Sequence, residues 1–440
     1  MERALIPTGT QPDQRPDENP ALNANLLEQV LSSPNIRLAW KQVRQNKGSA
    51  GEDRITLEAF PDWVRPQWSA LKASIRKGIY QPSPVKRVRI PKDDGSERLL
   101  GVPVVLDRVI QQAIVQVLSP KFDPGFSNHS HGFRPKRSAH DAVREVQGYC
   151  KQGKRMAVDI DLSKFFDRVN HDLLMSLLGR RIRDKGLLKL IGRYLRAGIQ
   201  DGNILLPSHE GVPQGGPLSP LLSNIMLDEL DKELERRGHS FSRYADDIII
   251  MVKSPRAGNR VLQSLNRFIE GDLKLKVNPD KSGVVKSSQC KFLGFCFRGD
   301  HIGWHPRSVE KFKHRVRELT NRSWGVSMET KIRELSVYLR GWINYYGIAN
   351  QYQQCVELDQ WIRRRIRMCY WKQWRKARTK IGNLIRLGVP RETAIKSGLS
   401  GKSYWRNSKS PTINMALSLE YLEQQGLYAL RDGWIAFHHG

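Results

Sequence analysis

The chain has 440 residues, and its 73 Lys and Arg residues outweigh 44 Asp and Glu residues to give a formal net charge of +29. That imbalance excludes an ordinary near-neutral enzyme and is typical of a polyanion binder, for which nucleic acid is the expected partner. The chain is too long for a single hydrophobic core, so we expect about two to four domains.

The sequence also carries signals about its compartment. Its five cysteines form neither metal-ligand pairs nor a disulfide framework, which fits a reducing environment. They are Cys150, Cys290, Cys296, Cys355 and Cys369. No signal peptide and no apolar run long enough to cross a bilayer is present. We therefore expect a cytoplasmic protein with no membrane partner.

The N-terminal segment is predicted in two parts. Residues 1–20 carry four prolines among polar neighbours and are predicted to be disordered. Residues 21–70 are predicted to be mostly helical, because apolar residues recur there at helical spacing. Those apolar residues are Leu26, Leu27, Val30, Leu31, Leu38, Ala39 and Val43.

Asp94-Gly95 is a two-residue turn signal and predicts a β-hairpin within residues 90–98. Lys92 and Arg98 flank this turn, so both cations can project from a finger-like ribbon. The alternative is that both are ordinary surface cations in a chain that has many of them.

Residues 156–162 predict a strand with an acidic face. Val158, Ile160 and Leu162 alternate with Asp159 and Asp161 at the period of a strand, so both aspartates lie on one face. After Leu162 the pattern breaks into a predicted helix.

A glycine-rich loop at 211–216 allows backbone conformations closed to other residues, and a helix is predicted to follow it. Ser219 followed by Pro220 predicts the cap and first turn of this helix, and Gly238 predicts its end. An apolar stripe at helical spacing is expected to face the core. It comprises Leu218, Leu221, Leu222, Ile225, Met226, Leu230 and Leu234.

Two adjacent carboxylates, Asp246 and Asp247, lie between apolar runs that predict strands. A buried ionised carboxylate costs several kcal/mol unless it is compensated, so we expect a tight turn that presents both to a divalent cation. Mg²⁺ is commonly held by one or two carboxylates plus substrate phosphates, and polymerases and nucleases use two such ions about 3.5–4 Å apart. With the acidic strand, this hairpin predicts a nucleotidyl-transfer site. The alternative is a plain hairpin with a solvated turn.

Apolar spacing predicts three helices between Pro306 and about Lys380. Residues 361–380 contain nine basic residues, no acidic residue and interleaved tryptophans. One face of such a segment can pack in a core while the other neutralises phosphates. The predicted nucleic-acid-binding residues are Arg363, Arg364, Arg365, Arg367, Lys372, Arg375 and Lys376. The alternative is a solvated charged helix, which would normally mix both signs.

Several blocks, taken in order, resemble bacterial group II intron-encoded reverse transcriptases from about residue 22 to beyond residue 400. The blocks are Asn46–Asp53, Ile90–Arg98, His131–Pro135, the acidic strand through Asp167, Gly211–Pro220, Tyr244–Asp247, Phe292–Phe295 and Arg340–Tyr346. The resemblance implies an α+β multidomain protein with the right-hand polymerase fold. Fingers and palm, with an antiparallel sheet that carries the YADD hairpin, would precede a helical thumb or maturase (X) domain and a small basic C-terminal domain.

The resemblance also implies a division of the chain. The expected segments are a disordered N-terminus (1–20), an N-terminal extension (21–70), fingers and palm (71–303), the thumb or maturase domain (304–380) and a DNA-binding C-terminal region (381–440).

The same resemblance implies the catalytic residues. The family spacing to the Phe-Phe-Asp triplet that ends at Asp167 selects Asp161 over Asp159, so Asp161, Asp246 and Asp247 would be the catalytic and metal-binding triad. The expected cofactor is a pair of Mg²⁺ ions, for which Mn²⁺ is an expected substitute. One ion would lower the pKa of the primer 3′-hydroxyl, and the other would stabilise the pyrophosphate leaving group.

By matched position, the nucleotide-binding residues would be Lys92, Arg98, Phe166 and Gln214. The two cations would lie over the triphosphate, Phe166 would obstruct a ribose 2′-hydroxyl, and Gln214 would contact nucleotide and template. For Phe166 the alternative is core packing, and the two roles can coexist.

The implied activity is RNA-directed DNA synthesis for retrohoming together with maturase binding of group II intron RNA. Its expected partners are that intron RNA, an RNA template with a DNA primer, target DNA and dNTPs, in a nucleoid-associated setting. Two alternatives are a maturase without polymerase activity and an intron-free relative in DNA repair or defence. No cysteine follows Cys369, so we expect a type without the HNH endonuclease, primed from a pre-existing DNA end.

Overall fold

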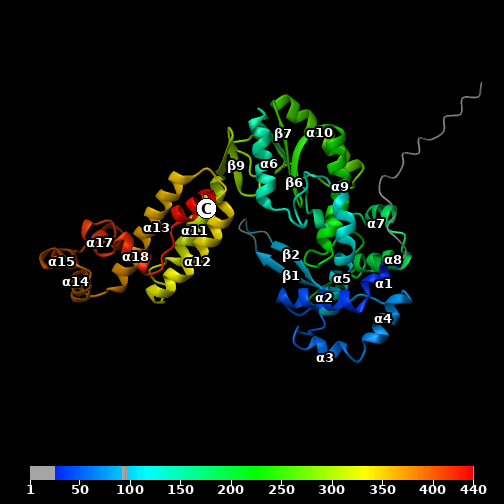
Figure 1. Cartoon of the computed structure of the whole chain (residues 1–440), viewed down its shortest axis with the longest axis horizontal. Coiled ribbons are helices and arrows are strands. Elements are labelled where there is room, and N and C mark those ends of the chain that lie inside the picture. The colour runs from blue at the N-terminus through cyan, green and yellow to red at the C-terminus, as the bar shows by residue number, and fades with distance from the viewer. Residues whose placement is uncertain (1–24, 92–94, 96, 440) are drawn as a thin grey trace, which may run out of the picture. The chain divides into compact units, whose positions relative to one another are not determined.

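The structure, a computed structural model, describes residues 25–91, 95 and 97–439 (Figure 1). The chain forms two compact units that interleave along the sequence. The first unit comprises residues up to 136, 161–238 and 263–279, and the second comprises 137–160, 239–262 and 280–440. The predicted disorder of residues 1–20 and the side chain of Lys92 lie outside the described residues.

The first unit is mostly helical and holds one mixed sheet. Its helices are α1 (Leu26–Val30), α2 (Ser33–Gln45), α3 (Phe60–Val64), α4 (Trp68–Arg76), α5 (Val105–Phe122), α7 (His171–Arg181), α8 (Lys185–Leu195) and α9 (Ser219–Arg236), with 3-10 turns η1 (Asp123–Gly125) and η2 (Phe165–Asp167). Its strands are β1 (Val85–Pro91), β2 (Glu97–Val102), β4 (Ile199–Asp201) and β5 (Ile204–Leu206), in the order β2-β1-β4-β5. β1 and β4 are parallel, whereas the other pairs are antiparallel.

The helices at the start of the chain pack on α5. The Asn35 side chain bridges α2 to its neighbours by donating to the carbonyls of Val30 and Ala113, at 3.0 Å each. The predicted apolar residues of this helical segment are buried except Leu38, which lies in α2 as predicted but is 56% exposed. Helical periodicity alone does not distinguish the edge of a buried face from its centre.

α9 buries the whole predicted apolar stripe, and Gly238 follows its end with φ 68°. Ser219 is the first helical residue, because the N-cap position belongs to Leu218. The predicted cap was therefore wrong. The Ser219 hydroxyl instead donates to the carbonyl of Pro213 at 2.6 Å and closes the glycine-rich loop onto the helix.

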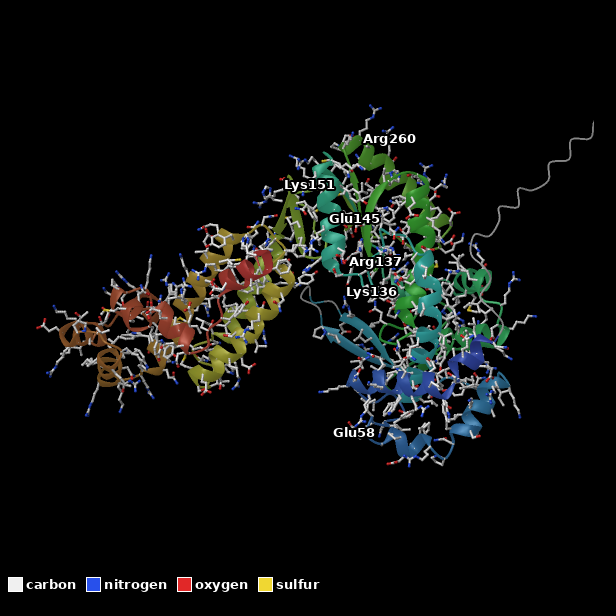
Figure 2. All side chains as sticks on the ribbon, viewed as in Figure 1. Glu58, Lys136, Arg137, Glu145, Lys151 and Arg260 are labelled. Atoms are coloured by element: carbon white, nitrogen blue, oxygen red, sulfur yellow. The ribbon has the colours of Figure 1, made fainter. Side chains whose placement is uncertain are left out.

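The second unit begins with an antiparallel sheet in the order β6-β7-β3-β8 and a separate β9–β10 ribbon. The strands are β3 (Met156–Ile160), β6 (Ser240–Tyr244), β7 (Asp247–Val252), β8 (Gly283–Lys286), β9 (Phe295–Arg298) and β10 (His301–Trp304). α6 (Ala139–Lys151) packs beside β6, where the Tyr149 hydroxyl donates to the carbonyl of Phe241 at 3.1 Å. Figure 2 shows Glu145 and Lys151 on this helix. α10 (Pro255–Gly271) continues from the second unit into the first.

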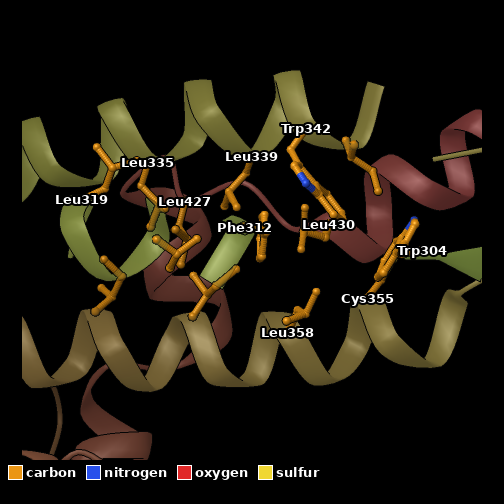
Figure 3. Packing of buried hydrophobic residues seen from close by; sticks show 14 of the residues in the cluster. Trp304, Phe312, Leu319, Leu335, Leu339, Trp342, Cys355, Leu358, Leu427 and Leu430 are labelled. Carbon is orange, nitrogen blue, oxygen red and sulfur yellow. The ribbon is translucent and has the colours of Figure 1, made fainter. Parts of the chain in front are cut away.

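The three helices predicted between residues 306 and 380 are confirmed as α11 (Pro306–Leu319), α12 (Met328–Tyr346) and α13 (Tyr352–Gln373). They share a hydrophobic core with the β9–β10 ribbon. Figure 3 shows this packing, with Leu335, Leu339 and Trp342 of α12 opposite Cys355 and Leu358 of α13. Aromatic rings fill the end near the ribbon, where the centroids of Phe312 and Trp342 lie 4.4 Å apart.

The C-terminal helices continue this core. They are α14 (Ala377–Arg386), α15 (Arg391–Gly398), α16 (Tyr404–Asn407), α17 (Pro411–Ala416), α18 (Leu419–Gln424) and α19 (Leu430–His439). The buried carboxylate of Asp359 on α13 accepts from the backbone N–H groups of Leu430 and Arg431 at 2.9 Å each, which ties α19 to α13. The predicted boundary after residue 380 falls inside α14. No helix among the described residues has the length and apolar character that a membrane span requires.

Candidate active site

The two adjacent aspartates lie where β6 turns into β7. Tyr244 pairs with Asp247, so Ala245 and Asp246 alone form the loop of the hairpin. Ala245 has φ 58°, the positive value that the first central residue of a type II′ turn requires. Asp246 is half-buried and Asp247 is exposed, while the following residues of β7 are buried. The turn therefore presents both carboxylates at the end of a buried ribbon.

A buried cation lies beneath this turn. Arg243 is 0% exposed, and its guanidinium donates to the carbonyl of Ala245 at 2.9 Å. A buried positive charge is thus bonded to the backbone of the residue that precedes Asp246. Sequence reasoning assigned no role to Arg243. The available signal was a single arginine inside an apolar strand, because such a charge must have a partner.

The acidic strand β3 lies next to β7 in the sheet. Asp159 pairs with Ile249 and Ile160 with Ile248, and the chain then continues into Asp161. Asp161 begins the segment 161–238 of the first unit, and its carbonyl accepts from the N–H of Asn278 at 2.8 Å. Segment 276–278, to which sequence reasoning gave no residue-level role, therefore holds the backbone of Asp161.

Asp159 has a different surrounding. It lies within β3, between Ile249 of β7 and Gly283 of β8. Burial chiefly raises the pKa of the Cys290 thiol, and the charges of Cys296 and Asp159 add to that rise. Asp159 is therefore close enough to Cys290 to affect its pKa, and the structural role expected for Asp159 stays a prediction.

The predicted nucleotide-binding residues Phe166 and Gln214 belong to segments that are bonded to one another. The N–H of Val212 donates to the carbonyl of Phe166 at 2.6 Å, and the carbonyl of Gln214 accepts from the N–H of Gly101 at 2.7 Å. The glycine-rich loop thus joins η2 to β2, the strand that carries the exposed Arg98. A Cβ on Gly215, whose φ is 122°, would lie 2.6 Å from the carbonyl oxygen of Gly101, so this close approach requires glycine.

The two rings of η2 have different surroundings. Phe165 is 2% exposed and belongs to the core, whereas Phe166 is half-buried and meets Phe165 edge-on, with ring centroids 5.1 Å apart. Phe165, rather than Phe166, is therefore the ring that mainly packs in the core. Part of the Phe166 ring remains available to a ligand.

A further turn in the second unit is held by α12. Leu293 and Gly294 have φ values of 52° and 86°, so the Phe292–Phe295 block is a tight turn. The Tyr345 hydroxyl donates to the carbonyl of Leu293 at 3.0 Å. Burial raises the pKa of Tyr345 to about 12, with added contributions from Tyr346, Tyr244 and Asp247. Tyr345 therefore lies within electrostatic range of the acidic hairpin.

Three of the predicted nucleic-acid-binding arginines make contacts within the protein. Arg364 lies 3.8 Å from the centroid of the Trp405 ring and donates to the Trp405 carbonyl, Arg365 donates to the Thr320 hydroxyl, and Arg367 donates to the Leu417 carbonyl. Burial lowers the pKa of Arg367 to about 10, and the neighbouring Arg363 adds to that effect. Arg375 and Lys376 are exposed.

No group of three or more His, Cys, Asp and Glu side chains lies together as metal ligands would in the part of the chain that the structure describes. The acidic hairpin supplies two neighbouring carboxylates, and these are the hard oxygen donors that Mg²⁺ takes. The chemistry of the donors fits Mg²⁺, and the complete triad stays a prediction.

Comparison with known proteins shows which class of protein carries this site. Residues 90–297 match the family described as reverse transcriptase (RNA-dependent DNA polymerase), and residues 309–388 match the group II intron, maturase-specific domain. The first match covers both the glycine-rich loop and the acidic hairpin. The protein is therefore an RNA-directed DNA polymerase.

Curated relatives narrow the class. The chain is 32% identical over 325 residues to "Protein YkfC" of Escherichia coli (strain K12), which covers 64% of this chain and 84% of that protein. It is 27% identical over 430 residues to "Group II intron-encoded protein LtrA" of Lactococcus lactis subsp. cremoris, with 74% and 71% covered. The chain belongs to the family of group II intron-encoded reverse transcriptases and maturases, as its sequence blocks predicted.

Among solved structures, a "Partial Cas6-RT-Cas1--Cas2 complex" aligns with 56% of this chain and 43% of that chain, at 27% identity and a TM-score of 0.37.

Proposed function

We propose that the protein extends a DNA primer on an RNA template through Asp161, Asp246 and Asp247. The observation that carries this proposal is the β3–β7 pairing, because Ile160, the residue before Asp161, lies opposite Ile248, the residue after Asp247. When bound, two Mg²⁺ ions, or Mn²⁺ in their place, would supply Lewis-acid stabilisation of the attacking and leaving oxygens. The three carboxylates would hold these ions and orient them.

The first unit would position the dNTP. Arg98 and Lys92 would neutralise its triphosphate from the β1–β2 ribbon. Phe166 would exclude a ribose 2′-hydroxyl, and Gln214 would contact the nucleotide and the template. The hydrogen bonds that link η2, the glycine-rich loop and β2 support this role, because they hold three of these residues on adjoining backbone segments.

We further propose that the protein binds group II intron RNA as a splicing maturase and copies that RNA into cDNA at a DNA target during retrohoming. The match of residues 309–388 to the maturase-specific domain supports RNA binding by the second unit. The net charge of +29 supports it as well, because a polyanion offsets the repulsion among so many cations.

The catalytic assignment is tested with Asp246→Asn, which keeps the size of the side chain and removes its charge. We expect primer extension with Mg²⁺ to fall by about three orders of magnitude, because a charge that holds the reacting groups is lost. The measurement is single-turnover extension of a DNA primer annealed to a short RNA template.

Asp272→Asn, at an exposed residue after α10, is the matched control and should extend at the wild-type rate. RNA binding by Asp246→Asn should also stay unchanged, which separates the polymerase role from the maturase role. Wild-type extension by Asp246→Asn would refute the proposed triad. Sequencing RNA that co-purifies with the protein would identify the bound intron.

A further inference from the structure

Three basic side chains from separate segments converge on the ring of Tyr404 in the second unit. Arg322 follows α11, Lys372 lies near the end of α13 and Lys380 lies in α14. The Arg322 Cζ and the Nζ atoms of Lys372 and Lys380 lie 5.4, 5.3 and 5.8 Å from the Tyr404 ring centroid. Each distance falls inside the range of about 6 Å over which a cation and an aromatic ring attract. We call Arg322, Lys372 and Lys380 the basic triad.

No carboxylate of the described residues offsets this charge. Among the residues that the structure describes, none of the basic triad is within ion-pair distance of an Asp or Glu side chain. Residues 361–380, which include Lys372 and Lys380, contain no acidic residue at all. Tyr404 attracts the cations through its ring but does not neutralise them, so three like charges are left to repel one another.

The framework around the basic triad is fixed by other cations. On α13, Arg365 donates to the Thr320 hydroxyl at 2.5 Å, and Arg364 donates to the carbonyl of Trp405 at 3.1 Å. Lys331 of α12, which is 3% exposed, donates to the carbonyls of Asn321 and Trp324 at 2.9 and 2.7 Å. These bonds hold the loop that carries Arg322, and the start of α16, against the helices.

These hydrogen-bonded cations and the basic triad therefore differ in what they can bind. Lys331, Arg364 and Arg365 each donate at least one hydrogen bond to a protein oxygen, so these side chains join segments of the core. The charged groups of Arg322, Lys372 and Lys380 are held near a ring, and no oxygen in the part of the chain that the structure describes accepts a hydrogen bond from them. Their donors are available to an anion with several oxygens, such as a phosphodiester.

We propose that the basic triad and Tyr404 form a binding site for a backbone phosphate of intron RNA. This proposal rests on the RNA-binding part of the proposed function. Charge complementarity identifies a phosphate as the occupant, and all three cations lie within the residues that match the maturase-specific domain, which favours RNA over target DNA. Only Lys372 of this site was predicted from the sequence, because the four residues come from three places in the chain.

The test uses the full chain with Arg322→Gln, Lys372→Gln and Lys380→Gln combined, and measures its Kd for a transcribed RNA stem-loop at several salt concentrations. Each lost phosphate contact lowers the salt slope by about one, so we expect the slope to fall by two to three, and affinity near 0.1 M salt to fall on the order of 100-fold. Lys380→Gln alone should lower the slope by about one, and Lys380→Arg should restore it.

The control is Arg183→Gln, Lys185→Gln and Lys189→Gln combined, which removes the same charge from three exposed positions of the first unit. An equal loss in this control would mean that net charge alone sets affinity, and the proposed site would be wrong. An unchanged slope in the triad variant, in a protein that keeps its wild-type circular dichroism spectrum, would also overturn it. So would loss of binding to a DNA duplex while RNA binding stays intact.

The outcome is independent of the catalytic proposal. On a short RNA template with an annealed primer at saturating concentration, the triad variant should extend at the wild-type rate, because the basic triad takes no part in catalysis. Asp246→Asn should show the reverse, with extension lost and RNA salt slope retained. If the triad variant binds RNA normally, the phosphate site fails while the polymerase assignment stands.

Discussion

The guanidinium of Arg243 is buried in β6 and bonded to the carbonyl of Ala245, so the backbone of the acidic turn rests on a cation. Two adjacent carboxylates repel each other, and a turn with a positive φ at alanine adds backbone strain of about 1–2 kcal/mol. A fixed positive charge opposes the first effect, and its hydrogen bond opposes the second. Arg243 thus supports both the shape and the charge of the acidic turn.

We expect Arg243→Met, which keeps most of the side-chain volume, to lower primer extension at least tenfold. Loss of a bond to a buried carbonyl costs about 1–3 kcal/mol, so the free energy of unfolding should fall by a similar amount. Single-turnover extension and urea denaturation measure the two effects. Arg298→Met, at an exposed end of β9, is the control. Normal extension by Arg243→Met would show that the turn does not need this cation.

Asp107 on α5 is a second buried charge, and it controls stability rather than catalysis. Its carboxylate is 1% exposed and accepts from the hydroxyls of Tyr80 and Tyr194 at 2.6 and 3.1 Å and from the N–H of Ser83 at 3.0 Å. Burial raises its pKa from the usual 3.8 to about 6, against the lowering effect of those hydrogen bonds. Between these two values the folded state holds a proton that the unfolded state has lost.

The free energy of unfolding should therefore decrease as the pH rises from about 4 to about 6, by up to about 3 kcal/mol from this group. Below pH 4 the carboxyl is protonated in both states, and above pH 6 the full cost of the buried charge is present. Asp107→Asn should remove this part of the pH dependence. Urea denaturation at pH 4.5, 5.5 and 7 compares the two proteins, and parallel pH profiles would contradict the assignment.

At the scale of elements, α12 connects the helical core to the turn at Phe292–Phe295. Tyr345 of α12 donates to the carbonyl of Leu293, and Ser308 of α11 adds a second bond from its hydroxyl to the carbonyl of Gly294 at 2.9 Å. A Cβ on Gly294 would lie 2.6 Å from the Tyr346 hydroxyl, so the helix fits the turn only because that residue is glycine. The aromatic end of α12 is therefore a positioning element for a turn that lies near the acidic hairpin.

Tyr345→Phe removes one hydrogen bond and keeps the ring. We expect the KM for the primed template to rise about three- to tenfold, because the bond is worth about 0.5–1.5 kcal/mol, with a smaller change in kcat. Tyr338→Phe, on the same helix and stacked on Phe312, is the control and should change neither constant. Steady-state extension on one RNA template separates KM from kcat, and identical constants in both variants would remove this role.

At the scale of the whole molecule, the two units divide the chain in a way that no single cut reproduces. The core of the second unit runs from Val143 and Val146 of α6, through Phe295 of β9, to Leu430 of α19. A fragment that began near residue 304 would lack α6 and β9, so the core residues that pack against them would be exposed. Experiments on the maturase-related helices therefore require the full chain.

The basic residues behind the net charge of +29 fall into two groups. Some cations, such as Arg365 and Lys331, donate hydrogen bonds to protein oxygens. Others, such as the basic triad, have no acidic residue of the described chain within ion-pair distance. Counting basic residues in segment 361–380 cannot separate these groups, because a helix turns each side chain toward a different neighbour. The predicted binding residues there included three arginines that join α13 to other segments.

Much of the local structure could be predicted because it depends on near neighbours. The period of apolar residues predicted α9 and α11–α13, and the apolar runs around two aspartates predicted the β6–β7 hairpin. The order of the blocks predicted the family. The error at Ser219 was local too, since the cap position depends on what packs beside it.

Tertiary structure decided which charged side chains make bonds inside the fold and which face outward. The burial of Arg243, the raised pKa of Asp107 and the bond from Tyr345 to Leu293 each depend on segments distant along the chain. The convergence of Arg322, Lys372 and Lys380 on Tyr404 has the same origin. Periodicity and motif order are properties of neighbouring residues and can be read directly, whereas the solvation and partners of a charged group depend on packing.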